Sequence, residues 1–179
     1  MIVVIRGVAG CGKSTVGQRL AAALGWVFVD ADDLHAAASI AKMAGGTPLD
    51  DADREPWLAR LRQRIDELDA AGTSAVLACS ALQRRHRARL LDGCAQARLV
   101  YLKASRALLA GRLHERARHF FPAALLDSQL AALEEPDDAL VMDAGRPLPD
   151  IVADIITGIG ADIRTGVRAT RERPGSWRR

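Results

Sequence analysis

An apolar run that passes directly into a glycine-rich loop constrains this chain more than any other feature. The run IVVI occupies residues 2–5, and GVAGCGKS at residues 7–14 fits the pattern G-x-x-x-x-G-K-[ST]. In such a loop successive backbone N–H groups point at phosphate oxygens, a lysine reaches the β- and γ-phosphates, and a hydroxyl binds Mg²⁺. The pattern therefore predicts a nucleoside triphosphate site, with contacts from Gly7, Gly10, Cys11, Gly12, Lys13 and Ser14.

The loop also marks the start of a helix, whose N-terminal end attracts phosphate. Val16, Leu20 and Leu24 recur on one helical face and Gly25 stands where a C-terminal cap belongs, so we expect this helix over 13–24. Strand-like and helix-like segments then alternate, which is typical of an α/β fold with a parallel sheet and helices on both faces. The expected strands are 2–5, 26–29, 74–79, 99–102 and 139–142, and the further helices are 53–71, 83–91, 105–115 followed by a longer helical region, and about 150–163.

The second expected helix carries a core-facing stripe. Trp57, Leu61, Ile65 and Leu68 recur at three- and four-residue steps, so we expect Trp57 to pack in the core rather than to contact a ligand.

The composition favours one domain. A chain of 179 residues with 49% hydrophobic content can bury one good core. No apolar run approaches the roughly 20 residues needed to cross a bilayer, and the chain enters a strand at once without a leader pattern, so we expect a cytoplasmic protein with no membrane partner. Cys11, Cys79 and Cys94 lack the spacing of a disulfide framework or a zinc site.

The positive charge is concentrated at the end of the chain. The formal net charge is +3, yet residues 164–179 hold six arginines against one acidic residue, Glu172. Without this segment the protein is slightly acidic, so we expect no nucleic-acid partner. Because the segment contains Pro174 and Gly175 and shows no periodicity, we predict a disordered basic tail after a single domain at 1–163.

Ligands of parallel sheets gather at the carboxyl ends of the strands. Asp30, Asp32 and His35 follow the second expected strand, and in an extended segment both carboxylates would face the same side, toward the loop. One could then orient a substrate hydroxyl while the other supports the metal, as phosphoryl transfer requires. The alternative is that the aspartates form a turn or a helix cap, and His35 could equally bond a hydroxyl or cap a helix. By its position, the stretch 143–148 is expected to border the base.

Basic side chains supply the remaining candidates. Arg116 could fold over the transferring group as part of a lid at about 112–124 and exclude water, although a solvated basic helix face remains the alternative. Arg54 and Arg87 lie where a small anionic acceptor could pair with a guanidinium. We therefore predict Lys13, Asp32 and Arg116 as the catalytic residues.

Together these motifs resemble the gluconate kinases (gluconokinases), small P-loop enzymes related in fold to shikimate and nucleoside monophosphate kinases. The similarity runs nearly end to end, and the block from Lys42 to Leu58 is far more specific than the phosphate loop. Beyond that loop, the resemblance rests on Asp30-Ala31-Asp32, His35, Lys42-Met43, Gly46-Thr47-Pro48-Leu49, Asp51, Asp53-Arg54, Pro56-Trp57-Leu58, Cys79-Ser80-Ala81-Leu82, Arg116, His119-Phe120-Phe121, Ser128-Gln129, Leu133-Glu134 and Pro136.

The resemblance implies a P-loop NTPase-type three-layer sandwich, with a five-stranded parallel sheet and a helical lid. It also implies phosphorylation of D-gluconate at its 6-hydroxyl by ATP, giving 6-phosphogluconate and ADP, usually in a dimeric cytoplasmic enzyme. Carried onto this chain, it assigns ATP and Mg²⁺ to Gly10, Gly12, Lys13, Ser14 and Thr15, the metal side to Asp30, the acceptor hydroxyl to Asp32, the lid to Arg116, and the sugar acid to His35, Arg54, Arg87 and His119.

The chain departs from the family pattern at three positions. Ser39 stands where the family usually has Asn, and Gln83 and His86 replace the Lys and Tyr that commonly follow Cys-Ser-Ala-Leu. Losing the Lys removes a cation near the acceptor unless Arg84 substitutes for it. A kinase for another small sugar acid therefore stays open, as does a nucleotide-dependent binding module, which would bind ATP without acceptor-stimulated turnover.

Overall fold

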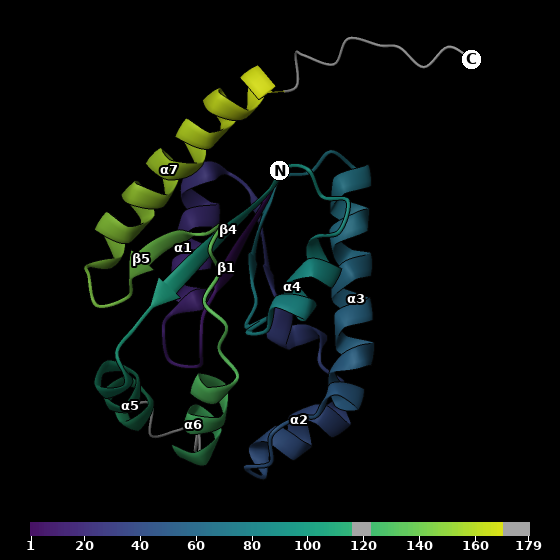
Figure 1. The fold of residues 1–179 in the computed structure, drawn as a ribbon, viewed down its shortest axis with the longest axis vertical. Coiled ribbons are helices and arrows are strands. Elements are labelled where there is room, and N and C mark those ends of the chain that lie inside the picture. Colours follow the sequence, from purple (N-terminus) through teal and green to yellow (C-terminus); the bar gives the residue numbers. More distant parts are fainter. Residues whose placement is uncertain (116–122, 170–179) are drawn as a thin grey trace.

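Five parallel strands form one sheet in the computed structural model, which describes the backbone of residues 1–115 and 123–169 and the side chains of 1–115 and 125–160. The strand order is β2-β3-β1-β4-β5, so β1 is central and pairs with β3 on one side and β4 on the other. This confirms the expected parallel sheet (Figure 1). The strands are β1 (Ile2–Arg6), β2 (Val27–Asp30), β3 (Ala75–Ala78), β4 (Ala97–Lys103) and β5 (Leu140–Asp143).

The helices agree with the expected ones to within a few residues, except that the last helix ends later and that a 3₁₀ turn at 31–34 and a short helix at 37–44 are additions. The short helix α2 was not expected, because its eight residues are too few to show a clear helical period. Helix α1 ends at Gly25 in the left-handed conformation, with φ of 66°, as its sequence predicts. The helices are α1 (Lys13–Leu24), the 3₁₀ turn η1 (Ala31–Leu34), α2 (Ala37–Ala44), α3 (Asp51–Ala70), α4 (Arg84–Leu91), α5 (Arg106–Glu115), α6 (Ala123–Ala131) and α7 (Leu148–Ala169).

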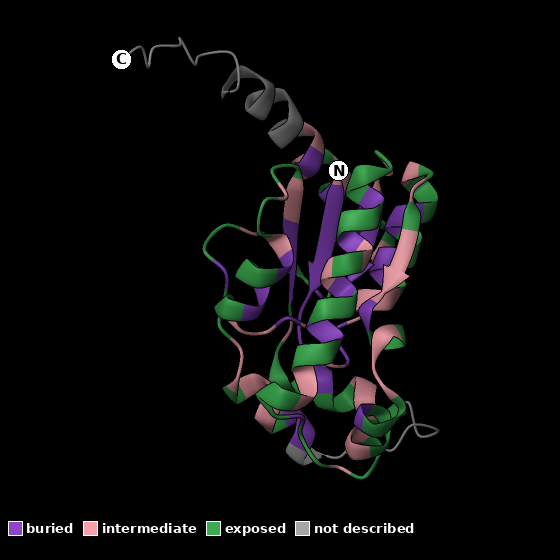
Figure 2. Cartoon of the chain, turned by 90° about the vertical axis from the view of Figure 1, so that its right-hand side faces the viewer, coloured by how far each residue is buried: buried purple, intermediate pink, exposed green. Residues whose placement is uncertain are grey.

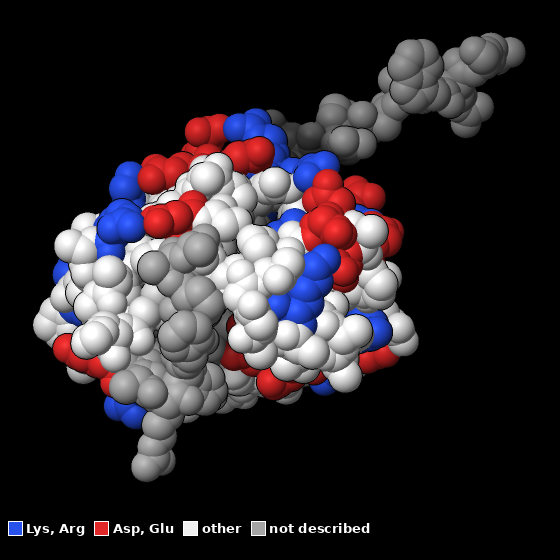
Figure 3. All heavy atoms as spheres, turned by 90° about the horizontal axis from the view of Figure 1, so that it is seen from below, with Lys and Arg blue, Asp and Glu red and all other residues white. Residues whose placement is uncertain are grey.

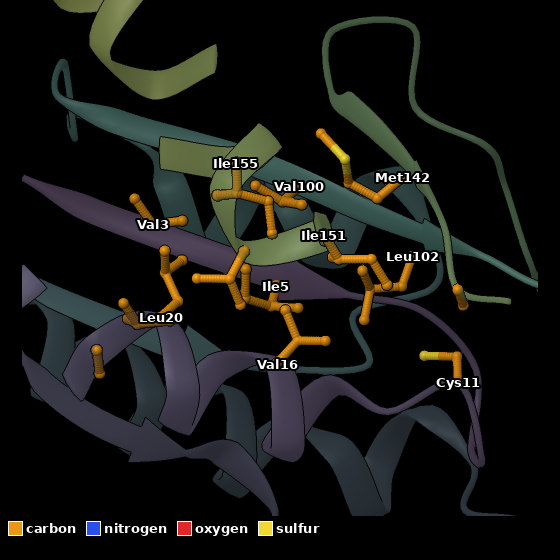
Figure 4. Close-up of a cluster of buried hydrophobic side chains, with 14 of the residues drawn as sticks. Val3, Ile5, Cys11, Val16, Leu20, Val100, Leu102, Met142, Ile151 and Ile155 are labelled. Carbon is orange, nitrogen blue, oxygen red and sulfur yellow. The ribbon is translucent and has the colours of Figure 1, made fainter. Parts of the chain in front are cut away.

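Alternate residues of β1 build two separate cores, one on each face of the sheet, because successive side chains of a strand point to opposite faces. Val3 and Ile5 belong to the cluster formed with α1 and α7, whereas Ile2 and Val4 belong to the cluster formed with α3. The sheet is therefore the middle layer of three, and its central strand is buried while the helices keep exposed outer faces (Figure 2). Figure 4 shows the first cluster, with labelled side chains Val3, Ile5, Cys11, Val16, Leu20, Val100, Leu102, Met142, Ile151 and Ile155.

Helix α3 covers the second face through the stripe that its sequence predicts. Trp57, Leu61, Ile65 and Leu68 are all buried. The Trp57 indole also donates a hydrogen bond of 2.7 Å to the carbonyl of Ala31, so the helix is fixed to the turn that follows β2. Packing is thus the role of Trp57, as expected.

The start of α3 is set by a capping box. The Asp50 carboxylate accepts the N–H of Asp53, and the Asp53 carboxylate accepts the N–H of Asp50, each at 2.9 Å. Lys42 of α2 pairs with both carboxylates. The Lys-Met block of the sequence therefore orders the connection between α2 and α3.

The C-terminal helix is longer than the sequence analysis expects. It runs to Ala169, whereas the predicted end is 163, so the predicted tail at 164–179 begins too early. No proline stands between Pro149, in the first turn of this helix, and Pro174, and each added residue of a helix gains one hydrogen bond. Residues 170–179 lie outside the described part of the chain. No helix among the described residues is both long and apolar enough to span a bilayer.

Candidate active site

The phosphate loop occupies the turn between the central strand β1 and helix α1. Gly7 has a φ of 148° and Gly12, which caps α1, has a φ of 98°, both in regions that side chains rarely adopt. A Cβ on Gly7 would lie 2.7 Å from the Cys11 sulfur and 2.9 Å from the Leu102 carbonyl oxygen. The close turn that a phosphate-binding loop needs is therefore present, with Cys11 buried beneath it.

Lys13 and Ser14 make the polar contacts of the loop. The Lys13 ammonium donates to the Val8 carbonyl at 3.2 Å, so it is folded back over the loop. The Ser14 hydroxyl donates to the Asp30 carboxylate at 2.6 Å, which joins the start of α1 to the end of β2. A hydroxyl and a carboxylate, both oxygen ligands that Mg²⁺ accepts, thus meet at the end of the loop.

The expectation that Asp30 and Asp32 lie in one extended segment is wrong. Asp32 lies within η1, because the second oxygen of the Asp30 carboxylate accepts the Asp32 N–H at 3.1 Å and caps the turn. Asp30 therefore combines the capping role with its contact to Ser14. Asp32 is exposed, and its carboxylate makes no hydrogen bond or ion pair with the residues that the structure describes.

His35 packs face to face with Trp57. The ring centroids are 4.7 Å apart and the planes differ by 9°. The Nδ1 atom of His35 is buried and has no hydrogen-bond partner among the described residues. Burial lowers the pKa of His35, and Arg54 and Arg60 lower it further, whereas Asp32 acts in the opposite direction. The imidazole is therefore a neutral, fixed side chain close to Asp32.

A cavity of about 350 Å³ opens beside the phosphate loop. Arg112 of α5 closes one side of it, donating to the carbonyls of Cys11 at 3.2 Å and Ala144 at 2.8 Å. Ala144, Arg146 and Leu148 of the stretch 143–148 contribute to the lining, whereas the parts played by Glu115 and Ile151 had no local signal. The lining residues are Gly10, Cys11, Gly12, Thr15, Val16, Arg112, Glu115, Ala144, Arg146, Leu148 and Ile151.

The two acceptor-side arginines differ in their surroundings. Arg54 lies on the first turns of α3, partly exposed, with its guanidinium 3.8 Å from the Asp51 carboxylate. Arg87 is buried, and its Nη1 donates to the carbonyls of Ala81 at 3.4 Å, Leu82 at 3.0 Å and Glu134 at 3.2 Å. Arg87 was expected to bind an anionic acceptor, but one nitrogen of its guanidinium is already bound to three backbone oxygens.

Arg6, which the sequence analysis gave no role, joins Arg87 in this position. It is the last residue of β1, fully buried, and donates to the carbonyls of Glu134 at 3.1 Å and Leu82 at 3.2 Å. Burial and the neighbouring Arg87 lower its pKa to about 10. The available signal was a charged residue that ends an apolar strand immediately before the phosphate loop.

Two of the three residues that depart from the family pattern, Gln83 and His86, are linked to the start of α3. Gln83 accepts a hydrogen bond of 2.9 Å from Arg85, and Arg85 pairs with Asp51 at 2.7 Å. The buried His86 has its Nε2 3.7 Å from the same Asp51 carboxylate. Arg84, which was left open as a substitute for the missing cation, is exposed and paired with Asp137 at 3.1 Å.

Arg116 and His119, together with the centre of the expected lid at 116–122, lie outside the described residues. The helices on either side of this segment, α5 and α6, lie at the carboxyl end of the sheet with α2 (Figure 1). Seen from that end, the visible surface carries acidic and basic side chains interspersed (Figure 3). This part of the surface therefore does not present a continuous charge of one sign.

The fold and the loop define a class. A parallel sheet of this order, with a phosphate loop after its central strand and oxygen ligands at the end of β2, is that of a P-loop kinase. A family model described as an AAA domain matches residues 2–136.

Known relatives narrow the class. The gluconokinase of Gluconobacter oxydans (strain 621H) is 46% identical over 151 residues, which cover 83% of this chain and 85% of the relative. The thermoresistant gluconokinase of Escherichia coli (strain K12) is 38% identical over 159 residues, covering 87% and 91%. The crystal structure of a gluconokinase from Sinorhizobium meliloti 1021 matches with a TM-score of 0.82 at 37% identity, covering 96% of this chain and 97% of that one. The chain belongs to the gluconokinase family and is a kinase.

The loop geometry predicts different costs at two glycines of positive φ. Gly25→Ala meets no atom within 4 Å and should cost about 1–2 kcal/mol in free energy of unfolding, from backbone strain alone. Gly7→Ala adds a clash with a backbone oxygen, so it should destabilise the protein more and also weaken ATP binding by roughly tenfold or more. Urea unfolding and titration calorimetry measure the two quantities. Equal losses of ATP affinity in both variants would contradict this account of the loop.

Two histidines should make the protein less stable in acid. Burial lowers the pKa of both His35 and His86 below the ordinary 6.5. The unfolded chain then binds protons more readily, so the stability present above pH 6.5 is lost as the pH falls through 6.5 toward the lowered values. The free energy of unfolding, measured between about pH 5.5 and 7.5, should fall toward acid, and His35→Gln should flatten the slope. The exposed His114→Gln is the control, and an equal flattening there would refute the assignment.

Proposed function

We propose that this kinase transfers the γ-phosphate of ATP to the 6-hydroxyl of D-gluconate, giving 6-phospho-D-gluconate and ADP. The observation that carries the proposal is the carboxylate of Asp32, which is exposed and unpaired among the described residues while the backbone N–H of Asp32 is held by the Asp30 carboxylate that also contacts Ser14. Phosphoryl transfer to an alcohol needs such a group to orient the hydroxyl and receive its proton. Membership of the gluconokinase family supplies the acceptor.

The cavity beside the loop is the proposed site of the adenine base. It adjoins Gly10 and Gly12 on one side and the apolar side chains of Leu148 and Ile151 on another. The planar guanidinium of Arg112 borders it, and such a group stacks favourably on aromatic rings. Loop N–H groups, Lys13 and Thr15 would then meet the phosphates.

Ser14 and Asp30 are the residues that we propose for Mg²⁺. Their side-chain oxygens are 2.6 Å apart, and a hydroxyl with a carboxylate is a donor set that suits this hard cation. When bound, Mg²⁺ would neutralise charge on the β- and γ-phosphates. Asp30 is also held by the Asp32 N–H, so its carboxylate is already oriented.

On the acceptor side, the proposal assigns Asp32 to the hydroxyl of gluconate, and Lys13 to the charge that develops on the phosphoryl group. Transfer is in line and needs no covalent intermediate. His35 and Arg54 are proposed to contact the sugar acid, together with His119, and Arg116 to close over the transferring group. Arg87 is proposed instead to support the turn at 81–82, because its guanidinium is bound to carbonyls.

The proposed enzyme works as a cytoplasmic homodimer. This rests on the resemblance to the family, which usually forms dimers. Light scattering coupled to size-exclusion chromatography tests the assembly, and a mass equal to that of the 19.2 kDa chain would contradict it.

The function is tested by ADP release with Mg·ATP against D-gluconate, related sugar acids, shikimate and a control without acceptor. We expect strong stimulation by gluconate alone. Stimulation by a different acid would retain the kinase and place the error in the acceptor, near Gln83 and Ser39. ATP binding without stimulation by any acceptor would favour the nucleotide-dependent binding module.

Asp32→Asn should lower kcat by roughly a hundredfold or more while changing ATP affinity little, because only the acceptor hydroxyl needs the carboxylate. The matched control is Asp33→Asn, which removes an exposed carboxylate from the next residue of the same turn and should leave kcat nearly unchanged. Steady-state kinetics and calorimetry provide the two readouts. If Asp32→Asn keeps most of its turnover, Asp30 becomes the candidate for this role.

A further inference from the structure

A side chain 120 residues away in the sequence accepts a hydrogen bond from the phosphate loop. The backbone N–H of Ala9 donates to Oε1 of Gln129, on helix α6, at 2.7 Å. Because a backbone N–H only donates, the amide of Gln129 must turn its oxygen toward the loop. The Ser128-Gln129 pair is part of the sequence pattern, but nothing in the proposed reaction uses it.

Gln129 and Lys13 hold the two ends of one peptide group. The Val8 carbonyl, which accepts from the Lys13 ammonium at 3.2 Å, and the Ala9 N–H, which donates to Gln129, belong to the same planar unit. Opposite ends of this unit are thus fixed by two side chains. The orientation of the peptide sets the path of the backbone into Gly10.

Helix α6 is a firm support for this contact. Leu126, one helical turn before Gln129, is 3% exposed and packs in the same core cluster as Cys11 and Leu109. Asp127 forms a two-pronged ion pair with Arg106 of α5, at 3.0 and 3.2 Å. The Gln129 side chain therefore reaches the loop from a helix that is fixed both to the core and to its neighbour.

ATP changes the balance between the two contacts. In the proposed reaction the Lys13 ammonium leaves the Val8 carbonyl to bind phosphate, so this end of the peptide loses its side-chain partner and keeps the long 3.4 Å hydrogen bond from the Cys11 N–H. The Gln129 contact does not compete with phosphate for Lys13, and it then remains as the side-chain contact that fixes this peptide. A loop held in place before ATP arrives has less conformational entropy to lose on binding.

We propose that Gln129 is a positioning residue for ATP, which holds the phosphate loop in its binding shape through the Ala9 N–H. This inference rests on the proposed use of ATP. It assigns a role in the site to α6, the helix that follows the expected lid segment, and it predicts that losing the Gln129 oxygen affects ATP rather than the acceptor.

The test is Gln129→Met, which keeps the length of the side chain and removes the acceptor oxygen. The KM for ATP should rise about tenfold, the equivalent of one ordinary hydrogen bond, with kcat at saturating ATP and the KM for gluconate each within about twofold of the wild type. The Ala9 amide should also exchange its hydrogen faster, as followed by NMR. Gln63→Met, which removes an exposed glutamine from α3, is the control and should change none of these values.

The outcomes separate the inference from the function on which it rests. If the wild type fails to turn over gluconate and ATP, the proposed function is wrong. If the wild type is active and the Ala9 amide exchanges faster in Gln129→Met while the KM for ATP stays unchanged, the contact is only structural and the inference is wrong. Equal rises in both KM values, with a lower melting temperature, would overturn it in the same way.

Discussion

The backbone turn between β1 and α1 is the constraint on which the rest of the structure depends. At Gly7 the chain passes so close to the Leu102 carbonyl that a Cβ would lie 2.9 Å from it. This close passage requires β4 as the neighbour of β1, while β3 pairs on the other side. The carboxyl ends of β3 and β4 therefore lie on either side of the phosphate loop. The residues that follow these strands are the candidates for catalysis and ligand binding.

Polar groups buried at this end of the sheet are satisfied mainly by backbone oxygens. Arg6 and Arg87 both donate to the carbonyls of Leu82 and Glu134, and Arg6 also lies over the ring of Tyr101, 5.0 Å from its centroid. Two neighbouring cations repel each other, so such a pair is stable only when fixed dipoles surround it. The segments at 81–82 and 134 are thereby tied together behind the loop, and this restrains the turn after β3.

The sequence predicts well what depends on local pattern, such as the phosphate loop, the strands, the extent of α1 and the core stripe of α3. It does not reveal contacts in which the partner of a side chain is distant in the sequence. Arg87 sits on an amphipathic helix and offers the charge that an acceptor needs, yet its direction depends on carbonyls up to 47 residues away. Gln129 contacts a residue 120 positions earlier, and no local period reveals such a contact. Asp30 and Asp32 were assigned to the correct edge, but their relative geometry was wrong because a cap, not a strand, joins them.

That cap bears directly on how the two aspartates divide their roles. One oxygen of Asp30 accepts the Ser14 hydroxyl and the other accepts the Asp32 N–H, so both oxygens are already engaged and aimed by the fold. A carboxylate bound in this way is suited to support a metal ion beside the phosphates, but poorly placed to take a proton from an incoming alcohol. Asp32 has the opposite character, because its backbone is fixed by the cap while its carboxylate is exposed. The hydrogen bond between these residues thus positions Asp32, the proposed proton acceptor, through its backbone N–H and does not use its carboxylate.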